Sequence, residues 1–324
     1  MILILSEPAD PTVRLVLPKL LDRGADVLWW DPADFPARAR LTAVVDGPDP
    51  RLLLHTGDAE HDLSAVTAVW NRRPGRPRAA AATDPEHRDR AESLARIHLA
   101  GFLDLLEARW LPARGRVLDA VHNKLTHLVP AVRHGFTVPE TVFTNDPGAL
   151  VPAWHRHGGR LVAKLLQPEE CRVDGERHLV YTTEVGRRQL AGRHRVRHEP
   201  VILQPYVDKD VELRVTVVGD RVFAAAIDSQ ASRLTRVDWR HYEDESVPYT
   251  ACELPADVAA RCAAYVAACG LSYGALDLIR TPAGEHVFLE INPNGHWGWI
   301  EDETGLPIGD AIAGWLLAAE EDPT

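Results

Sequence analysis

Two apolar segments that carry a few polar residues decide the fold of the C-terminal part of the chain: Leu276-Asp277-Leu278-Ile279 and Val287-Phe288-Leu289-Glu290-Ile291-Asn292-Pro293-Asn294-Gly295. The turn residues Pro282-Ala283-Gly284 lie between them, so the two segments are predicted to pair as a β-hairpin. Glu290 and Asn292 are two apart on a strand and therefore share one face. Counting back from the turn places Asp277 opposite Glu290. Three oxygen-bearing side chains are thus expected on one face of the hairpin.

Such a set of oxygen donors suits Mg²⁺, a hard cation that takes few protein carboxylates and completes its shell with phosphate oxygens. The alternative is an ordinary solvated face of the hairpin. Against it, these polar residues interrupt otherwise apolar strands, and Pro293-Asn294-Gly295 turns the chain immediately afterwards. We therefore predict Asp277, Glu290 and Asn292 to be magnesium ligands.

The composition describes a soluble globular chain. It has 324 residues, a net charge of −11 and 45% hydrophobic residues, and a length of this kind suggests two or three packed units at roughly 100–200 residues each. An acidic chain has no general attraction for nucleic acid or anionic membranes. We expect neither a membrane span nor a secretory signal, because no apolar run reaches roughly 18 residues and the start lacks a basic segment. The cysteines lack C-x-x-C spacing, which favours a reduced, cytoplasmic protein without a zinc site.

The order of the expected elements changes along the chain. Strands alternate with helices in the first 80 residues, which predicts a parallel sheet covered by helices, and two long helices and a β-rich part follow. The expected strands span 1–5, 25–30, 66–70, 160–166 and 201–207; hairpins are expected over 172–183 around Asp174-Gly175, over 212–227 and over 275–292; helices are expected over 11–23, 84–109, 117–134, 255–270 and 308–319.

Candidate nucleotide-binding residues precede the hairpin. Glu212 and Arg214 are two apart on a strand, and alone they could be an exposed charge pair of little energetic value. Just upstream, an apolar strand enters a proline turn at Gln204-Pro205-Tyr206-Val207. A nucleotide base can bond to the backbone of such a strand, while an acid accepts from the ribose hydroxyls and an arginine reaches the phosphates.

Two lysines and two arginines complete the set of candidates. Lys164 lies within an apolar strand, where a lysine needs an anionic partner or must extend to the surface. Lys124 begins a helical segment, and each lysine alone is more often structural, but beside a metal hairpin they suggest two contacts for a triphosphate. Arg72 and Arg73 follow the strand that ends at Trp70, and open α/β sheets place functional groups just past the strand ends.

In this order along the chain, Lys124, Lys164, Gln204–Val207, Glu212, Arg214, Asp277 and Glu290-x-Asn292 resemble the ATP-grasp ligases. A Gly-x-x-x-x-Gly-Lys-Ser/Thr phosphate loop is absent from the sequence, in agreement with that resemblance. Within the superfamily, the chain is most similar to the graspetide maturases, which form ω-ester and ω-amide macrocycles in ribosomal peptides. The matching segments include Val69-Trp70-Asn71-Arg72-Arg73-Pro74, Ile227-Asp228-Ser229-Gln230, Asp238-Trp239-Arg240 and Asn292-Pro293-Asn294-Gly295-His296-Trp297. Within them, the Arg-Arg-Pro, Ile-Asp-Ser-Gln and Asn-Gly-x-Trp pieces are specific to that family.

The resemblance implies a mixed α/β (α+β) ATP-grasp fold. A Rossmann-like pre-ATP-grasp domain is expected over 1–117, a central lid over 118–200 and a catalytic domain over 201–324. It also implies that ATP and Mg²⁺ activate an Asp or Glu side chain of a precursor peptide as an acyl phosphate, which a Ser/Thr hydroxyl or a Lys amine of the same peptide then attacks. Lys124, Lys164 and Arg214 would bind phosphates, Glu212 the ribose, and Gln204–Val207 the base.

The same resemblance assigns the remaining roles. Arg240, and also Arg72 or Arg73, would stabilise the acyl phosphate or hold the substrate acid. Two alternatives stay open for the base: Asp228, or none. A leader segment of the precursor would bind the hairpin near 172–181, which is otherwise a plain exposed hairpin. A homodimer is implied by analogy alone.

Two other functions fit the same sequence. A related ligase could join an amine to a carboxylate between separate molecules and need no leader peptide. Alternatively, the chain could bind a nucleotide without catalysis and act as a scaffold. The intact set of Asp277, Glu290 and Asn292 argues against the scaffold.

Overall fold

The computed structural model describes residues 1–166, 170–173, 176–241 and 246–321. Its N-terminal part is a parallel four-stranded sheet in the order β2-β1-β6-β7. The strands are β1 (Ile2–Ser6), β2 (Val27–Trp30), β6 (Ala68–Arg73) and β7 (Arg109–Leu111). The expected parallel sheet is confirmed, and β6 ends at Arg73, the second of the two candidate arginines.

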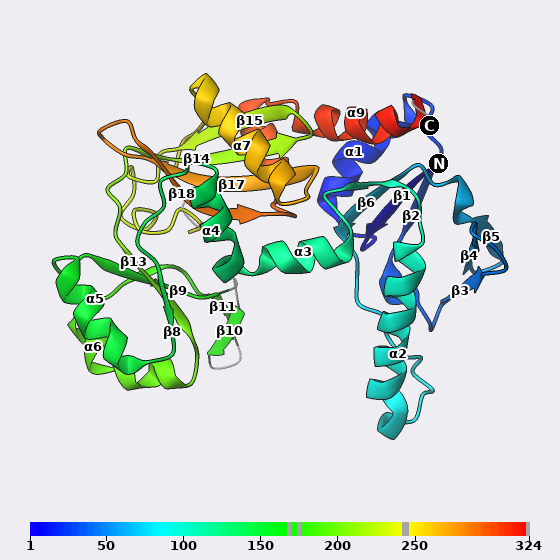
Figure 1. Cartoon of the computed structure of the whole chain (residues 1–324), viewed down its shortest axis with the longest axis horizontal. Helices are drawn as coiled ribbons and strands as arrows, with labels where there is room; N and C mark the ends of the chain where they lie inside the picture. The colour runs from blue at the N-terminus through cyan, green and yellow to red at the C-terminus, as the bar shows by residue number, and fades with distance from the viewer. Residues whose placement is uncertain (167–169, 174–175, 242–245, 322–324) are drawn as a thin grey trace.

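Helices cover both faces of this sheet, as Figure 1 shows. They are α1 (Pro11–Leu21), capped by Asp10, and α2 (Pro85–Asp104), capped by the expected Asp84. Because side chains alternate along a strand, Ile2 and Ile4 of β1 pack in the same core as α1, whereas Leu3 and Leu5 pack in the same core as α2.

The part of the chain that connects β2 to β6 forms a small antiparallel sheet, which was not predicted. It consists of β3 (Ala39–Val44), β4 (Arg51–Thr56) and β5 (Ala59–Asp62) in that order. Leu52 and Leu54 of β4 are buried in the α2 core, so this sheet extends the N-terminal unit rather than forming its own.

The single helix expected over 117–134 is wrong. The structure has two helices, α3 (Gly115–His122) and α4 (Lys124–Arg133). Asn123 between them is extended, with φ −80° and ψ 103°, and its side chain accepts a hydrogen bond from the backbone N–H of Leu125 at 3.0 Å. The break makes Lys124 the first residue of α4, at a helix N-terminus that is free to turn away from the α3 axis.

The central lobe is a four-stranded sheet in the order β12-β9-β13-β8. Its elements are β8 (Val142–Thr144), α5 (Leu150–Arg156), β9 (Leu161–Lys164), β12 (Thr183–Glu184), α6 (Arg187–Ala191) and β13 (Val201–Pro205). The boundary expected at residue 200 falls at the start of β13, one strand before the chain leaves this sheet. The expected hairpin is present as β10 (Glu170–Val173) and β11 (Glu176–Leu179), but its predicted turn Asp174-Gly175 lies outside the described residues.

The largest sheet is antiparallel, with five strands in the order β16-β15-β14-β17-β18. They are β14 (Val211–Val218), β15 (Arg221–Ile227), β16 (Tyr249–Cys252), β17 (Tyr273–Arg280) and β18 (His286–Asn292). Both predicted hairpins, β14–β15 and β17–β18, are confirmed. Helices α3, α4 and α7 (Ala256–Ala268) share one core with this sheet.

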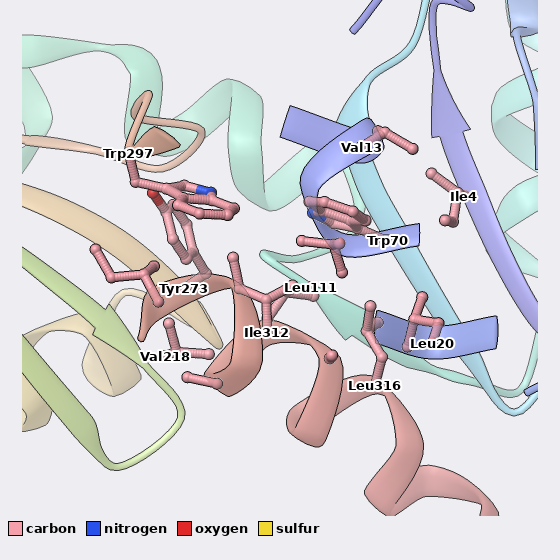
Figure 2. Close-up of a cluster of buried hydrophobic side chains, with 14 of the residues drawn as sticks. Ile4, Val13, Leu20, Trp70, Leu111, Val218, Tyr273, Trp297, Ile312 and Leu316 are labelled. Atoms are coloured by element: carbon pink, nitrogen blue, oxygen red, sulfur yellow. The ribbon is translucent and has the colours of Figure 1, made fainter. Parts of the chain in front are cut away.

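The chain ends by returning to the N-terminal sheet through α8 (Gly298–Thr304) and α9 (Ile308–Glu321). Ile312 and Leu316 of α9 pack against Val13 and Leu20 of α1, and Trp297 is fully buried in the same cluster (Figure 2). The two ends of the chain therefore share one core (Figure 1). In the described part of the chain, no helix has the length and apolar character needed to span a bilayer.

Candidate active site

The β17–β18 hairpin brings the three predicted metal ligands together. Asp277 is the register partner of Glu290, and the pairing shifts directly after Asp277. Such a bulge re-aims side chains. The Asn292 amide nitrogen donates to Asp277 Oδ2 at 3.0 Å and to Glu290 Oε1 at 3.2 Å. The two carboxylates thus lie within reach of one common partner, while their role as metal ligands stays a prediction.

Two of the predicted phosphate-binding cations hold these carboxylates. Arg214 Nη1, from the neighbouring strand β14, donates to both oxygens of Asp277 at 2.8 and 2.9 Å. Lys124 Nζ lies 2.7 Å from Glu290 Oε2. Glu212 and Arg214 are both buried, so the alternative of an exposed charge pair is wrong.

Burial and charge act in opposite directions on the two acids. Burial raises the pKa of Asp277 to about 6, although the Arg214 guanidinium opposes the shift. Burial would also raise the pKa of Glu290, but the Lys124 ammonium outweighs it and holds that pKa well below its usual range. Glu290 is therefore the firmly ionised member of the pair.

The donor set fits Mg²⁺ better than a transition metal. Within the described ranges, no group of three or more His, Cys, Asp and Glu side chains forms a metal site. Zinc sites are built mainly from His nitrogens and Cys sulfurs. Mg²⁺ instead accepts one or two carboxylates and takes its other ligands from phosphate and water. Asp277, Glu290 and Asn292 match the second pattern.

A narrow cleft lies between the central lobe and the large sheet, and we call it the lysine cleft. Its lining includes Lys124, Lys164, Gln204, Pro205, Tyr206, Val207, Lys209, Glu212, Asp238, Arg240, Asp277 and Glu290. Its cavity volume is only about 70 Å³, against ~300–1,000 Å³ for small-molecule sites. A nucleotide can therefore enter only if the central lobe or the lining side chains move.

Three lysines surround this cleft. Burial lowers the pKa of Lys164, and the Glu290 carboxylate opposes that shift. Lys209 Nζ lies 2.8 Å from Glu212 Oε1, and both side chains are buried. The sequence reasoning missed Lys209, although its place between the Gln204–Val207 segment and Glu212 was a usable signal.

The predicted base-binding segment, Gln204 to Val207, is partly occupied by hydrogen bonds within the protein. The Gln204 side chain is buried and donates to Thr141 Oγ1 at 2.8 Å. Its amide is thus already used within the protein, as is the Tyr206 backbone N–H, which donates to the backbone oxygen of Arg160 at 3.0 Å.

A second hollow, the hairpin groove, lies on the other side of the hairpin acids. Its lining includes Arg73, His122, Tyr181, Arg214, Trp239, Arg240, Asp277, Glu290, Asn292, Asn294, His296 and Trp299. Arg240 lines both the groove and the lysine cleft. Asp238 fixes it with a hydrogen bond from Arg240 Nε at 2.8 Å and also accepts from the Thr182 backbone at 2.8 Å. Asp238 is thus a positioning residue for Arg240, a role that the sequence analysis did not predict.

The remaining candidates separate in space. Arg73 lines the hairpin groove, whereas Arg72 is buried and donates to the backbone oxygen of Asn294 at 2.8 Å and to Thr12 Oγ1 at 3.0 Å. Asp228 follows β15 and, among the described residues, lines neither the lysine cleft nor the hairpin groove. Its assignment as a base gains no support from this position.

Comparisons with known proteins agree with this architecture. Residues 1–117 match the family model of the MvdD pre-ATP grasp domain. The macrocyclase MdnB of Microcystis aeruginosa is 31% identical, with 98% of each chain covered and a TM-score of 0.80. A RiPP-associated ATP-grasp ligase of Chryseobacterium gregarium, solved with ADP and a leader and core peptide, is 27% identical over 99% of this chain and 97% of its own, with a TM-score of 0.89.

A third relative extends the same likeness. The macrocyclase MdnC of Microcystis aeruginosa, solved with its precursor peptide MdnA, is 26% identical over 98% of this chain and 99% of its own, with a TM-score of 0.84. No match was found among curated protein sequences.

The fold and the site define an ATP-grasp ligase. The chain belongs to the graspetide maturases, the ATP-grasp macrocyclases of ribosomal peptides.

Proposed function

We propose that the chain uses ATP and Mg²⁺ to close macrocycles in a ribosomally made precursor peptide. One observation carries the proposal: Asp277, Glu290 and Arg240 line both the lysine cleft and the hairpin groove. A nucleotide in the cleft and a peptide carboxylate in the groove would therefore meet at these residues. The ADP and peptides bound by the Chryseobacterium ligase support this division of the site.

The lysine cleft supplies charge for the nucleotide. Lys124, Lys164 and Lys209 would bind phosphate oxygens, and Glu212 would accept from the ribose hydroxyls. Bound between Asp277, Glu290 and Asn292, Mg²⁺ would neutralise charge on the transferring phosphoryl group. These contacts position charge for phosphoryl transfer, which requires little covalent chemistry from the protein.

The reaction has two balanced steps. A carboxylate oxygen of the peptide attacks the γ-phosphorus of ATP, the bond to ADP breaks, and an acyl phosphate forms. A hydroxyl or an amine of the same peptide then attacks the acyl carbon, phosphate leaves, and the proton of the nucleophile passes to phosphate or solvent. Each ring therefore removes the elements of one water and converts one ATP to ADP and phosphate. Arg240, which faces both sites, would stabilise the acyl phosphate.

An intact-mass assay tests the proposal. The enzyme is mixed with Mg²⁺, ATP and the Asp/Glu- and Ser/Thr/Lys-bearing peptide encoded beside its gene, and we expect whole waters to be lost only when ATP is present. Glu290→Gln should lower the rate at least about 100-fold, because it removes a carboxylate that would hold Mg²⁺. Glu285→Gln, an exposed substitution in the turn of the same hairpin, should leave the rate unchanged.

The other outcomes identify the rival functions. A gain of mass with an added amine, without loss of water from the peptide, would indicate an intermolecular ligase. ATP binding without any change of peptide mass would indicate a scaffold. Ring formation by Glu290→Gln at the wild-type rate would show that the metal assignment is wrong.

Four finer assignments belong to the same proposal. We propose that the hairpin β10–β11 binds the leader, that the site forms esters with hydroxyls and amides with amines, and that the protein is a cytoplasmic homodimer. Tandem mass spectrometry of the product distinguishes ester from amide, and the mass of the enzyme in solution tests the dimer. Leader-free peptide, added at the same concentration, tests whether the leader is needed for binding.

A further inference from the structure

A third hollow lies beyond the hairpin groove, against the end of β6, and we call it the arginine cleft. It is lined by Glu7, Asp31, Arg38, Arg72, Arg73, Arg78 and neighbouring residues. Its cavity volume of about 780 Å³ contrasts with about 70 Å³ in the lysine cleft. That volume falls within the ~300–1,000 Å³ of small-molecule sites, so the arginine cleft is open to a ligand as it stands.

The arginine cleft is continuous with the hairpin groove. Arg73, His122 and Asn294 line both of them. A peptide that presents one carboxylate to Arg240 in the hairpin groove can therefore extend into the arginine cleft without leaving the protein surface.

The cations of this cleft differ in whether the protein already neutralises them. Arg38 and Arg72 each have an aspartate partner. Arg73 and Arg78 are exposed, and among the described residues neither side chain has an ion pair or a hydrogen bond. Two guanidinium groups are thus available to an anionic ligand.

The acids of the cleft do not neutralise these two arginines. Asp31 Oδ1 accepts hydrogen bonds from the backbone N–H groups of Ala33 at 3.0 Å and Gly75 at 2.8 Å. A Cβ at Gly75 would lie 2.6 Å from the same oxygen, so only glycine permits this turn. Glu7 makes no ion pair with Arg73 or Arg78 in the described structure. Asp31 keeps its charge, but the backbone holds it and, in the described structure, it makes no ion pair with Arg73 or Arg78 either. Both guanidinium groups therefore remain available to an anionic ligand.

A buried amide marks the junction between the two hollows. Asn294 Oδ1 is buried and, among the described residues, has no hydrogen-bond partner, and leaving such a group unsatisfied is unfavourable. An N–H of a bound peptide at this point would satisfy it.

We propose that the arginine cleft binds a carboxylate of the substrate peptide other than the one being activated, through Arg73 and Arg78. Guanidinium groups match carboxylates with paired, charge-assisted hydrogen bonds. By holding one acid, the cleft would set which other acid reaches Arg240 in the hairpin groove, and hence the position of the ring. The inference rests on the proposed function, because it assumes a peptide in the hairpin groove.

The experiment compares Arg78→Gln with Arg76→Gln, because Arg76 is an equally exposed arginine that does not line the cleft. The probes are the precursor peptide encoded beside the gene, variants with single Asp→Asn or Glu→Gln changes, and a form with an amidated C-terminus. We expect Arg78→Gln to raise KM about tenfold, the scale of one charge-assisted hydrogen bond, with kcat within about twofold. Arg76→Gln should match the wild type, and Arg78→Lys should lie between.

The peptide variants identify the carboxylate that is bound. One amide change should raise KM for the wild type but add nothing for Arg78→Gln, because the two changes remove the same contact. If the amidated C-terminus gives that pattern, the bound group is the C-terminal carboxylate rather than a side chain. An unchanged KM for Arg78→Gln, or equal and independent losses from every peptide variant, would overturn the inference. If the wild type removes no water from the unmodified precursor, the proposed function fails instead.

Discussion

Gly295 lies where the loop after β18 passes closest to the large sheet. A Cβ at this position would lie 2.4 Å from Ala275 Cβ and 2.8 Å from Arg214 Nη2. The backbone oxygen of Gly295 also accepts a hydrogen bond from the buried Tyr273 hydroxyl at 2.6 Å. If the loop moved away to make room for a side chain, it would lose the hydrogen bond from Tyr273. Arg214, which holds Asp277, lies directly against Gly295.

Gly295→Ala should therefore lower both stability and activity. The added methyl group should cost about 1–3 kcal/mol by overpacking, and displacement of Arg214 should disturb Asp277. Urea denaturation and the water-loss assay measure the two effects. Gly101→Ala is the matched control, because a Cβ there meets nothing within 4 Å in the interior of α2 and alanine favours a helix by about 1 kcal/mol. Equal effects of both substitutions would contradict the packing argument.

Substitution of Lys164 distinguishes a role in ATP binding from a role in stabilising the fold. Burial disfavours its charged form, while the Glu290 carboxylate opposes that effect. Lys164→Met should keep or raise the melting temperature, because it replaces a half-buried charge with an apolar chain of similar length. The same substitution should raise KM for ATP at least about tenfold, the scale of one hydrogen bond to a charged group. A fall in melting temperature with an unchanged KM for ATP would assign the lysine to the fold instead.

The break between α3 and α4 is the element that places Lys124. The extended backbone at Asn123 ends one helix, and its side chain caps the next. Lys124, at the start of α4, can then reach Glu290, whose carboxylate lies 2.7 Å away. A continuous helix through this point would carry the lysine along the α3 axis instead.

Asn123→Ala should consequently impair catalysis more strongly than a variant that loses the same amount of stability elsewhere in the protein. Loss of the cap should cost about 1 kcal/mol, and the moved Lys124 should raise KM for ATP. Asp84→Ala removes a similar cap at the start of α2, where Asp84 accepts from the Glu86 backbone at 2.9 Å. It should cost a similar amount of stability without changing the kinetics. Parallel kinetics for the two variants would show that the break has no catalytic role.

Elements defined by local signals were predictable from the sequence. The two hairpins of the large sheet combine alternating strands with short turns, and the register between Asp277 and Glu290 follows from counting back from the turn. The helix break was not predictable, because the apolar pattern continues through Asn123 and asparagine is only mildly unfavourable in a helix. The β3–β5 sheet was missed since it interrupts an otherwise regular strand–helix alternation.

Partners of the site residues required the three-dimensional structure. Arg214 and Asp277 form an ion pair although they are 63 residues apart in the sequence. Lys124, which pairs with Glu290, lies on helix α4 and not in the large sheet. No spacing rule joins such residues. The sequence could name the charged groups of the site, but not which of them neutralise each other or that Arg72 and Arg73 face different surroundings.

At the scale of the molecule, the chain closes on itself. Helix α9 packs against α1 in the core that also contains Ile2 and Ile4 of the first strand (Figure 2). The loop between β18 and α8 lies at the junction of this core with the large sheet, because Trp297 and Tyr273 belong to the same cluster. We therefore expect the position of the hairpin acids to depend on contacts with the N-terminal unit.

Arg72 is the polar link across that junction. It donates from the end of β6 to the backbone oxygen of Asn294, 222 residues later, and its Nε lies 3.5 Å from the buried Asp10. Arg72→Met leaves that carboxylate without its cation, and breaking a buried pair costs about 3–5 kcal/mol. Lys19→Met is the control: Lys19 also joins the two ends of the chain, 2.7 Å from Asp310, but both side chains are partly exposed, so about 0–1 kcal/mol is expected.

Kinetic measurements then show whether Arg72 positions the active site in addition to stabilising the fold. At a temperature where Arg72→Met is fully folded by circular dichroism, its kcat for water loss should still fall, because the freed Asn294 loosens the loop that directly follows Asn292 at the end of β18. KM for ATP should change little, since the lysine cleft does not include Arg72. A variant that loses stability but keeps the wild-type kcat would show that the hairpin holds its geometry alone, and that the N-terminal unit serves the substrate rather than the metal site.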